Sequence, residues 1–169
     1  TNVAHPLDVT TETLFQVGSI TKTVTATTMM RLVEAGELDL DAPIRTYVPG
    51  FRVRDADASS RATLRNLLTH TAGWTGDCFA DTGDGDDAAR LYVDQMADLA
   101  QLAPLGTTYS YNNAGFCLAG HIIERVTGKG FGVVARELAL DPIGVGAAHF
   151  RPQDVMTHRF ASGHIAGDD

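Results

Sequence analysis

The stretch from residue 20 to residue 35 constrains the fold of this chain more than any other. It has helical spacing, stops at Gly36, and contains five threonines and two valines, which are poor intrinsic helix formers. Its charged residues are limited to Lys22, Arg31 and Glu34. Because a weak helix former with so little charge must be stabilised by burial, we expect a central helix packed on several sides.

Apolar periodicity predicts four more helices. They cover residues 64–69 after the N-cap candidate Thr63, residues 87–102, residues 112–127 before the stop residue Gly128, and residues 131–140. Few segments alternate in the way that strands do. We therefore expect a mainly helical chain.

Composition excludes several classes of function. The 169 residues suffice for one domain, and the net charge of −8 argues against nucleic acid and anionic lipid as partners. No apolar run approaches the roughly 20 residues that span a bilayer. Residues 1–8 do not resemble a signal peptide, and the compartment stays open.

Two cysteines are too few for a disulfide framework or a zinc cluster. Cys117 lies in an apolar stretch and is predicted to fill core space, whereas Cys78 lies in a polar loop. We expect two free thiols, with a bridge between them as the alternative.

Ser19 and Lys22 open the central helix three residues apart, which brings both side chains onto one face. The lysine can then take part in deprotonating the serine, which is a weak nucleophile until a base activates it. The positive end of the helix favours developing negative charge at the same point. Taken alone, the pair also fits an N-cap serine followed by a solvated lysine.

Tyr111 and Asn113 supply a second group of polar side chains at the head of the helix 112–127. A tyrosine can carry a proton between a nucleophile and a leaving group, and the asparagine amide can both donate to a substrate carbonyl and accept from an ammonium. The alternatives are a surface aromatic for Tyr111 and a helix cap for Asn113.

These residues fall within four blocks that resemble the serine β-lactamase-related family. The blocks are residues 15–22 (FQVGSITK), 67–73 (LLTHTAG), 109–115 (YSYNNAG) and 137–145 (ELALDPIGV). They occur in the order of that family, which includes class C β-lactamases, penicillin-binding proteins, D-aminopeptidases and β-lactamase-like esterases. The resemblance implies an α/β fold of the β-lactamase/transpeptidase type, of which this chain holds mainly the helical part.

The resemblance also assigns roles to individual residues. It implies Ser19 as the acylated nucleophile, Lys22 as its activating partner, Tyr111 as general base and acid, and Asn113 as the amide that positions the substrate. The backbone N–H of Ser19 would be one oxyanion donor. In this family the region around the loop 76–87 lies near the mouth of the site, so Trp74 and Phe79 are expected to touch an apolar acyl group. No metal or organic cofactor is implied.

One element of the family pattern is absent. No Lys-Thr-Gly or His-x-Gly triplet occurs on a predicted strand, and residues 164–167 (HIAG) have one residue too many. We therefore expect residues 1–169 to form a partial domain whose remainder lies outside this chain, and an isolated fragment that is inactive.

The substrate class stays open between an ester or β-lactam-like amide and a D-amino-acid peptide. A non-catalytic penicillin-recognising module with the same fold is a further alternative. His70 suggests a Ser-His-Asp arrangement, but it lacks a clear orienting carboxylate and is predicted to be a structural hydrogen-bonding group. The acidic loop 76–87 lacks the spacing of an EF-hand and is predicted to be solvated. Oligomeric state cannot be read from these residues, and members of the resembling family are often extracytoplasmic or periplasmic.

Overall fold

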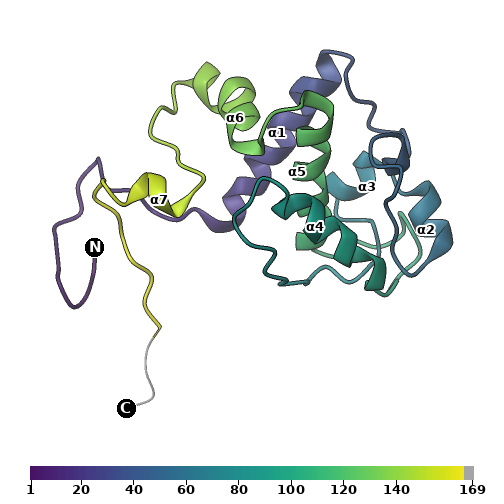
Figure 1. Ribbon diagram of the computed structural model, residues 1–169, viewed down its shortest axis with the longest axis horizontal. Helices are drawn as coiled ribbons and strands as arrows, with labels where there is room; N and C mark the ends of the chain where they lie inside the picture. The colour runs from purple at the N-terminus through teal and green to yellow at the C-terminus, as the bar shows by residue number, and fades with distance from the viewer. Residues whose placement is uncertain (166–169) are drawn as a thin grey trace.

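A computed structural model describes residues 1–165, so that the end of the segment 164–167 lies outside the described residues. The α-helices are α1 (Thr21–Glu34), α2 (Ala56–Arg61), α3 (Leu64–Leu68), α4 (Ala88–Gln95), α5 (Asn113–Thr127), α6 (Phe131–Ala135) and α7 (Pro152–Val155). In residues 1–165, strand-like pairing is limited to isolated bridges, which agrees with the expected helical chain. α5 lies at the centre of the helical body, and the N-terminal segment lies to one side of it (Figure 1).

The predicted central helix is present as α1, preceded by the 3₁₀ turn η1 (Gly18–Ile20). Two buried threonines direct their hydroxyls to carbonyls of the preceding turn, from Thr25 to Thr21 at 3.0 Å and from Thr28 to Val24 at 2.8 Å. These bonds satisfy polar groups that burial would otherwise penalise. Only one side of α1 is buried, however, and Thr23 and Thr27 are exposed. The expected packing on several sides is therefore not present in residues 1–165.

The second central helix, α5, ends at the predicted stop Gly128, but its N-cap is Asn112 and not the alternative cap Asn113, which is the first helical residue. The Asn112 side chain accepts a hydrogen bond from the Gly115 backbone N–H at 2.7 Å, and Gly128 ends the helix in the left-handed conformation at φ 68°. Leu118 and Ile122 on its inner face are fully buried. α5 packs against α1, α3, α4 and α6.

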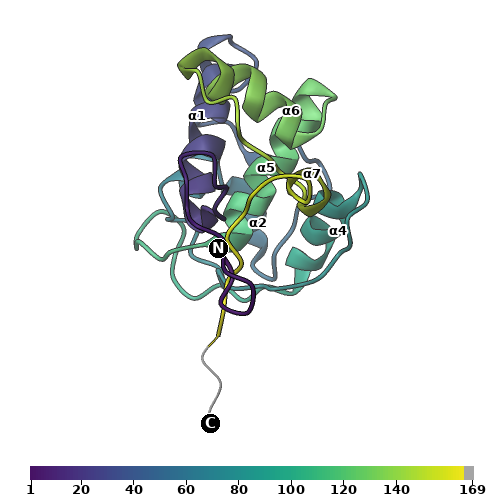
Figure 2. The same ribbon diagram turned by 90° about the vertical axis from the view of Figure 1, so that its left-hand side faces the viewer.

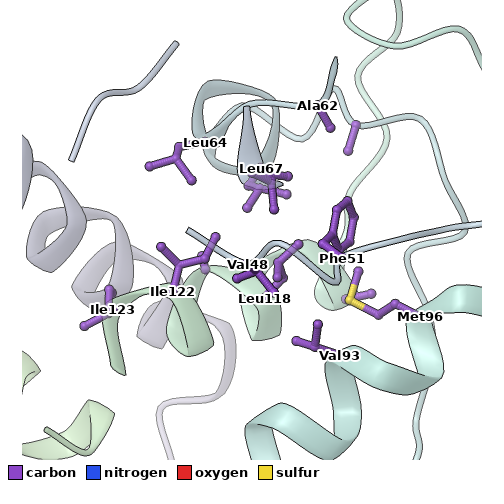
Figure 3. Packing of buried hydrophobic residues seen from close by; sticks show 14 of the residues in the cluster. Val48, Phe51, Ala62, Leu64, Leu67, Val93, Met96, Leu118, Ile122 and Ile123 are labelled. Atoms are coloured by element: carbon purple, nitrogen blue, oxygen red, sulfur yellow. The ribbon is translucent and has the colours of Figure 1, made fainter. Parts of the chain in front are cut away.

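The core lies between α5, α3, α4 and the connector 38–53 (Figure 3). Phe51, Leu67, Met96 and Leu118 are each no more than 1% exposed. α3 begins at the predicted N-cap Thr63, which forms a capping box with Asn66, and it buries Leu67 in the core. The core fixes α5, and with it the N-terminal end of that helix.

Two predicted helices have different boundaries in the structure. The helix predicted over 87–102 ends at Gln95 and continues only as the 3₁₀ turn η3 (Met96–Asp98). Gln101 then pairs with Trp74, which requires extended backbone. The helix predicted over 131–140 is divided into α6 and the π-helical turn η4 (Arg136–Leu140).

The N-terminal segment runs alongside the segment that follows α7 (Figure 2). Leu14 forms a parallel bridge with Phe160, and the Ser162 backbone N–H donates to the Thr1 carbonyl at 2.8 Å. Among the helices within residues 1–165, none combines the length and the apolar character that crossing a membrane requires.

Candidate active site

Ser19 lies in η1 and Lys22 in the first turn of α1, so that local helical geometry brings them together. The Lys22 Nζ donates to the Ser19 Oγ at 3.2 Å. Gly18, directly before the serine, has φ +51°, a left-handed conformation that favours glycine. The sharp turn there presents the serine side chain at the surface.

The segment before α5 completes the cluster from the other side. The Tyr111 hydroxyl donates to the Ser19 Oγ at 2.7 Å, and Lys22 Nζ donates to the Asn113 Oδ1 at 2.7 Å. The ammonium also lies 4.6 Å from the centre of the Tyr111 ring. The structure thus brings together the four polar side chains that the sequence singled out, within hydrogen-bond contact of one another.

Asn112 anchors the backbone from which Tyr111 and Asn113 project. It is 1% exposed, and its side-chain N–H donates to the Trp74 carbonyl at 2.9 Å. Its backbone N–H donates to the His70 Nδ1 at 2.9 Å. A buried residue that is bonded on both sides cannot shift freely, so its neighbours Tyr111 and Asn113 are held in place.

Charge and hydrogen bonding act on the Tyr111 hydroxyl. The neighbouring Lys22 ammonium, followed by the hydrogen bond to Ser19, lowers the pKa of Tyr111 below its ordinary value. A lowered pKa increases the fraction of Tyr111 that is ionised near neutral pH. Tyr111 is therefore the side chain in this cluster that is best placed to exchange a proton with Ser19.

His70 is a structural hydrogen-bonding group, as its sequence context predicts. Its Nδ1 accepts the Asn112 bond, and its ring stacks on Tyr111 with the ring centres 4.7 Å apart. Partial burial, and secondly the charge of Lys22, lowers the pKa of His70. The neutral imidazole is the form that can accept this bond.

Asp77 also belongs to the cluster, although nothing in the sequence distinguishes it. Its Oδ1 accepts a hydrogen bond from the Asn113 Nδ2 at 2.9 Å. Asp77 is one of several aspartates in the loop 76–87, and neither spacing nor periodicity distinguishes it from the others. Only the folded arrangement shows which of them reaches the cluster.

Trp74 does not join the cluster. Its side chain is 0% exposed and packs on Phe51, with ring centres 5.7 Å apart. In this structure its contribution is the backbone carbonyl that holds Asn112. Phe79, the other aromatic residue near this loop, is exposed.

A pocket of about 520 Å³ opens beside Ser19 and Lys22. Its far wall consists largely of apolar groups from α4 and α5, including Tyr92, Phe116 and Cys117. A larger groove beside α6 contains none of the four clustered side chains.

The expected placement of Cys117 in the core is wrong, because its helical position faces this pocket and the residue is exposed. Cys78 and Cys117 are both free thiols. Within residues 1–165, no group of three or more His, Cys, Asp or Glu side chains is arranged to hold a metal ion.

Comparison with known proteins identifies what this arrangement resembles. The family model described as Beta-lactamase matches residues 1–169. Penicillin-binding protein 4 of Amycolatopsis lactamdurans is 40% identical over 157 residues, which cover 93% of this chain and 41% of that protein. Esterase EstB of Burkholderia gladioli is 35% identical over 148 residues, which cover 79% of this chain and 38% of that protein.

The same fold occurs in a solved structure of a class C β-lactamase from Rhodobacter sphaeroides. The two chains superpose with a TM-score of 0.73 and 30% identity, over 92% of this chain and 42% of the other. The chain spans about two fifths of the length of the curated relatives that it matches. The expected β-lactamase/transpeptidase-like fold, of which this chain holds mainly the helical part, is thus confirmed.

Proposed function

Because this chain belongs to the β-lactamase family, we propose that it carries the nucleophile of a serine hydrolase that forms an acyl-enzyme on Ser19. The observation that carries the proposal is the convergence of two proton-exchanging groups on one hydroxyl. Tyr111 and Lys22 lie 2.7 Å and 3.2 Å from the Ser19 Oγ. A serine hydroxyl with two such partners has the environment that nucleophilic catalysis requires.

The proposed first half-reaction begins when Tyr111, in its ionised form, accepts the proton of Ser19. The Oγ then attacks the carbonyl carbon of an ester or amide, and the carbonyl π electrons move to oxygen. The Ser19 backbone N–H is the proposed oxyanion donor. One such donor contributes about 3–4 kcal/mol of barrier lowering where its removal has been measured.

When the tetrahedral intermediate collapses, the bond between the carbonyl carbon and the leaving group breaks. The leaving alcohol or amine takes the proton from Tyr111, and the acyl group stays on Ser19. Water then attacks the ester carbonyl, gives its proton back through Tyr111 to the Ser19 Oγ, and releases a carboxylic acid. Throughout this sequence Lys22 holds Asn113 and supplies positive charge beside Tyr111.

Asn113 is the proposed substrate-positioning amide. Its Oδ1 is occupied by Lys22 and one N–H by Asp77. An amide NH₂ group carries two hydrogens, so one remains to donate to a substrate carbonyl. Trp74 is left out of this proposed site because its side chain is buried.

An ester or β-lactam-like amide is the substrate class that we propose first, with a small molecule rather than nucleic acid as the partner. A D-amino-acid peptide, hydrolysed or transferred, is the second candidate. Relatives named as an esterase and as a penicillin-binding protein have comparable sequence identity to this chain, so we retain both substrate classes as candidates. A non-catalytic penicillin-recognising module is the third candidate. We further propose that residues 1–169 are part of a larger domain, whose remaining residues supply the triplet absent here.

The test is covalent labelling of the full-length protein that contains this chain. The protein is incubated with p-nitrophenyl acetate or with a penicillin, quenched, and examined by intact mass beside Ser19→Ala and the surface control Ser60→Ala. We expect a mass adduct in the native protein and in Ser60→Ala, and none in Ser19→Ala. Ester turnover should fall at least about 10³-fold in Ser19→Ala. An adduct that persists in Ser19→Ala, or a folded native protein that neither reagent labels, would contradict the proposal.

A further inference from the structure

The Asn113 amide has a different charged partner on each side. Its Oδ1 lies 2.7 Å from the Lys22 ammonium, and its Nδ2 lies 2.9 Å from a carboxylate oxygen of Asp77. An ammonium can only donate hydrogen bonds and a carboxylate can only accept them. Only one orientation of the amide satisfies both partners, with the oxygen toward Lys22 and the nitrogen toward Asp77.

The backbone fixes Asp77 from both neighbouring residues. The Gly76 carbonyl accepts from the Ala114 backbone N–H at 2.9 Å, which ties the loop to the first turn of α5. The Cys78 carbonyl accepts from the Tyr92 hydroxyl at 2.6 Å, which ties it to α4. The carboxylate of Asp77 thus projects from a short backbone segment that is held at both ends.

Asp84 is a suitable control residue for Asp77. Asp84 belongs to the same loop and is exposed, as Asp77 is. In the part of the chain that the structure describes, no side-chain hydrogen bond or ion pair to Asp84 is found, whereas Asp77 reaches Asn113. Replacement of Asp84 therefore removes one negative charge from the loop without removing a contact to the cluster.

We propose that Asp77 is a positioning residue, which holds the Asn113 amide so that its oxygen faces Lys22 and its free N–H faces the substrate. This inference rests on the proposed function of Ser19, because positioning has a consequence only if the cluster performs acyl transfer. Asp77 acts through Asn113. Without Asp77, water replaces the carboxylate and the amide can rotate, so that Lys22 loses a fixed partner.

If the Asn113 amide is misoriented, it positions the substrate poorly and the acylation of Ser19 becomes slower. Enzymes lower reaction barriers by holding reacting groups in fixed positions, and small displacements cost large factors in rate. Since Asp77 is exposed and water competes for its hydrogen bond, we expect a moderate loss, about 10-fold in the acylation rate constant for Asp77→Ala. Asp77→Asn keeps an oxygen that can accept from the Asn113 Nδ2, and should recover most of the rate.

The pH profile provides a readout that loss of structure alone would not produce. The negative charge of Asp77 raises the pKa of Tyr111 and so opposes the stronger lowering influence of Lys22 and Ser19. Removing that charge lowers the pKa of Tyr111 further. The acidic limb of the acylation profile should therefore move to lower pH in both Asp77→Ala and Asp77→Asn, and stay in place in Asp84→Ala.

The experiment measures the acylation rate constant of the full-length protein by stopped flow with p-nitrophenyl acetate from pH 5 to 9. Native protein, Asp77→Ala, Asp77→Asn and Asp84→Ala are compared, and thermal unfolding of each establishes that it is folded. A slow Asp77→Ala, a recovered Asp77→Asn and an unchanged Asp84→Ala support the inference. If Asp77→Ala acylates at the native rate, or if Asp77→Asn is as slow as a folded Asp77→Ala, the inference is overturned.

The outcome for Ser19 separates this inference from the proposed function. If Ser19 is acylated and Asp77→Ala acylates at the native rate, the proposed function stands and the positioning role fails. If the folded native protein is not acylated at Ser19, both fail together. Should Asp77→Ala not fold, Asp77→Leu takes its place, because leucine has no hydrogen-bond acceptor for the Asn113 Nδ2. A slowed acylation in folded Asp77→Leu supports the inference, and a native rate overturns it.

Discussion

The Tyr111 hydroxyl lies 2.7 Å from the Ser19 Oγ, although 92 residues separate the two in the chain. The contact depends on the packing of α5 against α1, since Tyr111 directly precedes the N-cap of α5 and Ser19 lies in the 3₁₀ turn η1 that leads into α1. The buried face of α5 therefore determines where the proposed proton acceptor Tyr111 lies relative to the proposed nucleophile Ser19. Packing in the core and chemistry at the surface are connected through these two residues.

Tyr111→Phe should lower the acylation rate constant about 10²- to 10⁴-fold, the usual range for loss of a general acid–base group. The substitution removes the hydroxyl and retains the ring that stacks on His70. The free energy of unfolding should change little, because Tyr111 is 43% exposed. Stopped-flow acylation with p-nitrophenyl acetate measures the effect.

Tyr109→Phe is the matched control, since Tyr109 lies on the same segment and is 68% exposed. This variant should acylate at the native rate. An equal rate in Tyr111→Phe and in the native protein would mean that Lys22 alone deprotonates Ser19.

Local sequence rules predicted the parts of the fold that local interactions determine. The stop of α5 at Gly128 and the N-cap of α3 at Thr63 follow from glycine conformation and side-chain hydrogen bonds within a few residues. Ser19 and Lys22 belong to this class as well, because one helical turn brings them together.

Features that depend on distant partners were predicted less well. α4 ends at Gln95, and Gln101 pairs with Trp74 in a bridge that no periodicity in residues 87–102 indicates. Cys117 lies in an apolar run, yet its side of α5 faces the pocket rather than the core. Asp77 acquires its partner only when the loop 76–87 is tied to α5 through Gly76.

Stability should decrease as the pH falls below neutral, because two histidines are held in their neutral form. Burial is the main cause that lowers the pKa of His121, and partial burial together with Lys22 lowers that of His70. The unfolded chain therefore binds protons near pH 6.5 that the folded chain does not. Since the unfolded state binds more protons, the contribution of these residues is present above about pH 6.5 and is lost as the pH falls toward their folded pKa values.

Urea unfolding of the protein at pH 7.5 and at pH 5.5 measures this dependence. His121→Leu should reduce the difference in unfolding free energy between the two pH values, because it removes one of the two histidines. His5→Leu, at an exposed position near the N-terminus, should leave the difference unchanged. An undiminished difference in His121→Leu would show that other groups cause the acid sensitivity.

Gly76→Ala should impair acylation through the backbone that carries Tyr111. A Cβ at Gly76 would lie 2.5 Å from the Tyr111 carbonyl oxygen and 2.9 Å from the Asn112 Cα. Both are backbone atoms, so relief requires the segment before α5 to move rather than a side chain to rotate. Overpacking of this kind costs about 1–3 kcal/mol of stability, and a displacement near 1 Å at reacting groups costs about 10²-fold in rate.

Gly50→Ala is the appropriate control for that variant, because nothing lies within 4 Å of a Cβ at Gly50. It should acylate at the native rate and unfold within about 0.5 kcal/mol of the native protein. Measuring acylation and urea unfolding on both variants separates displacement of Tyr111 from general loss of structure. If Gly76→Ala loses stability but acylates at the native rate, the approach of residue 76 to Tyr111 serves folding alone, and the loop does not determine where the tyrosine lies.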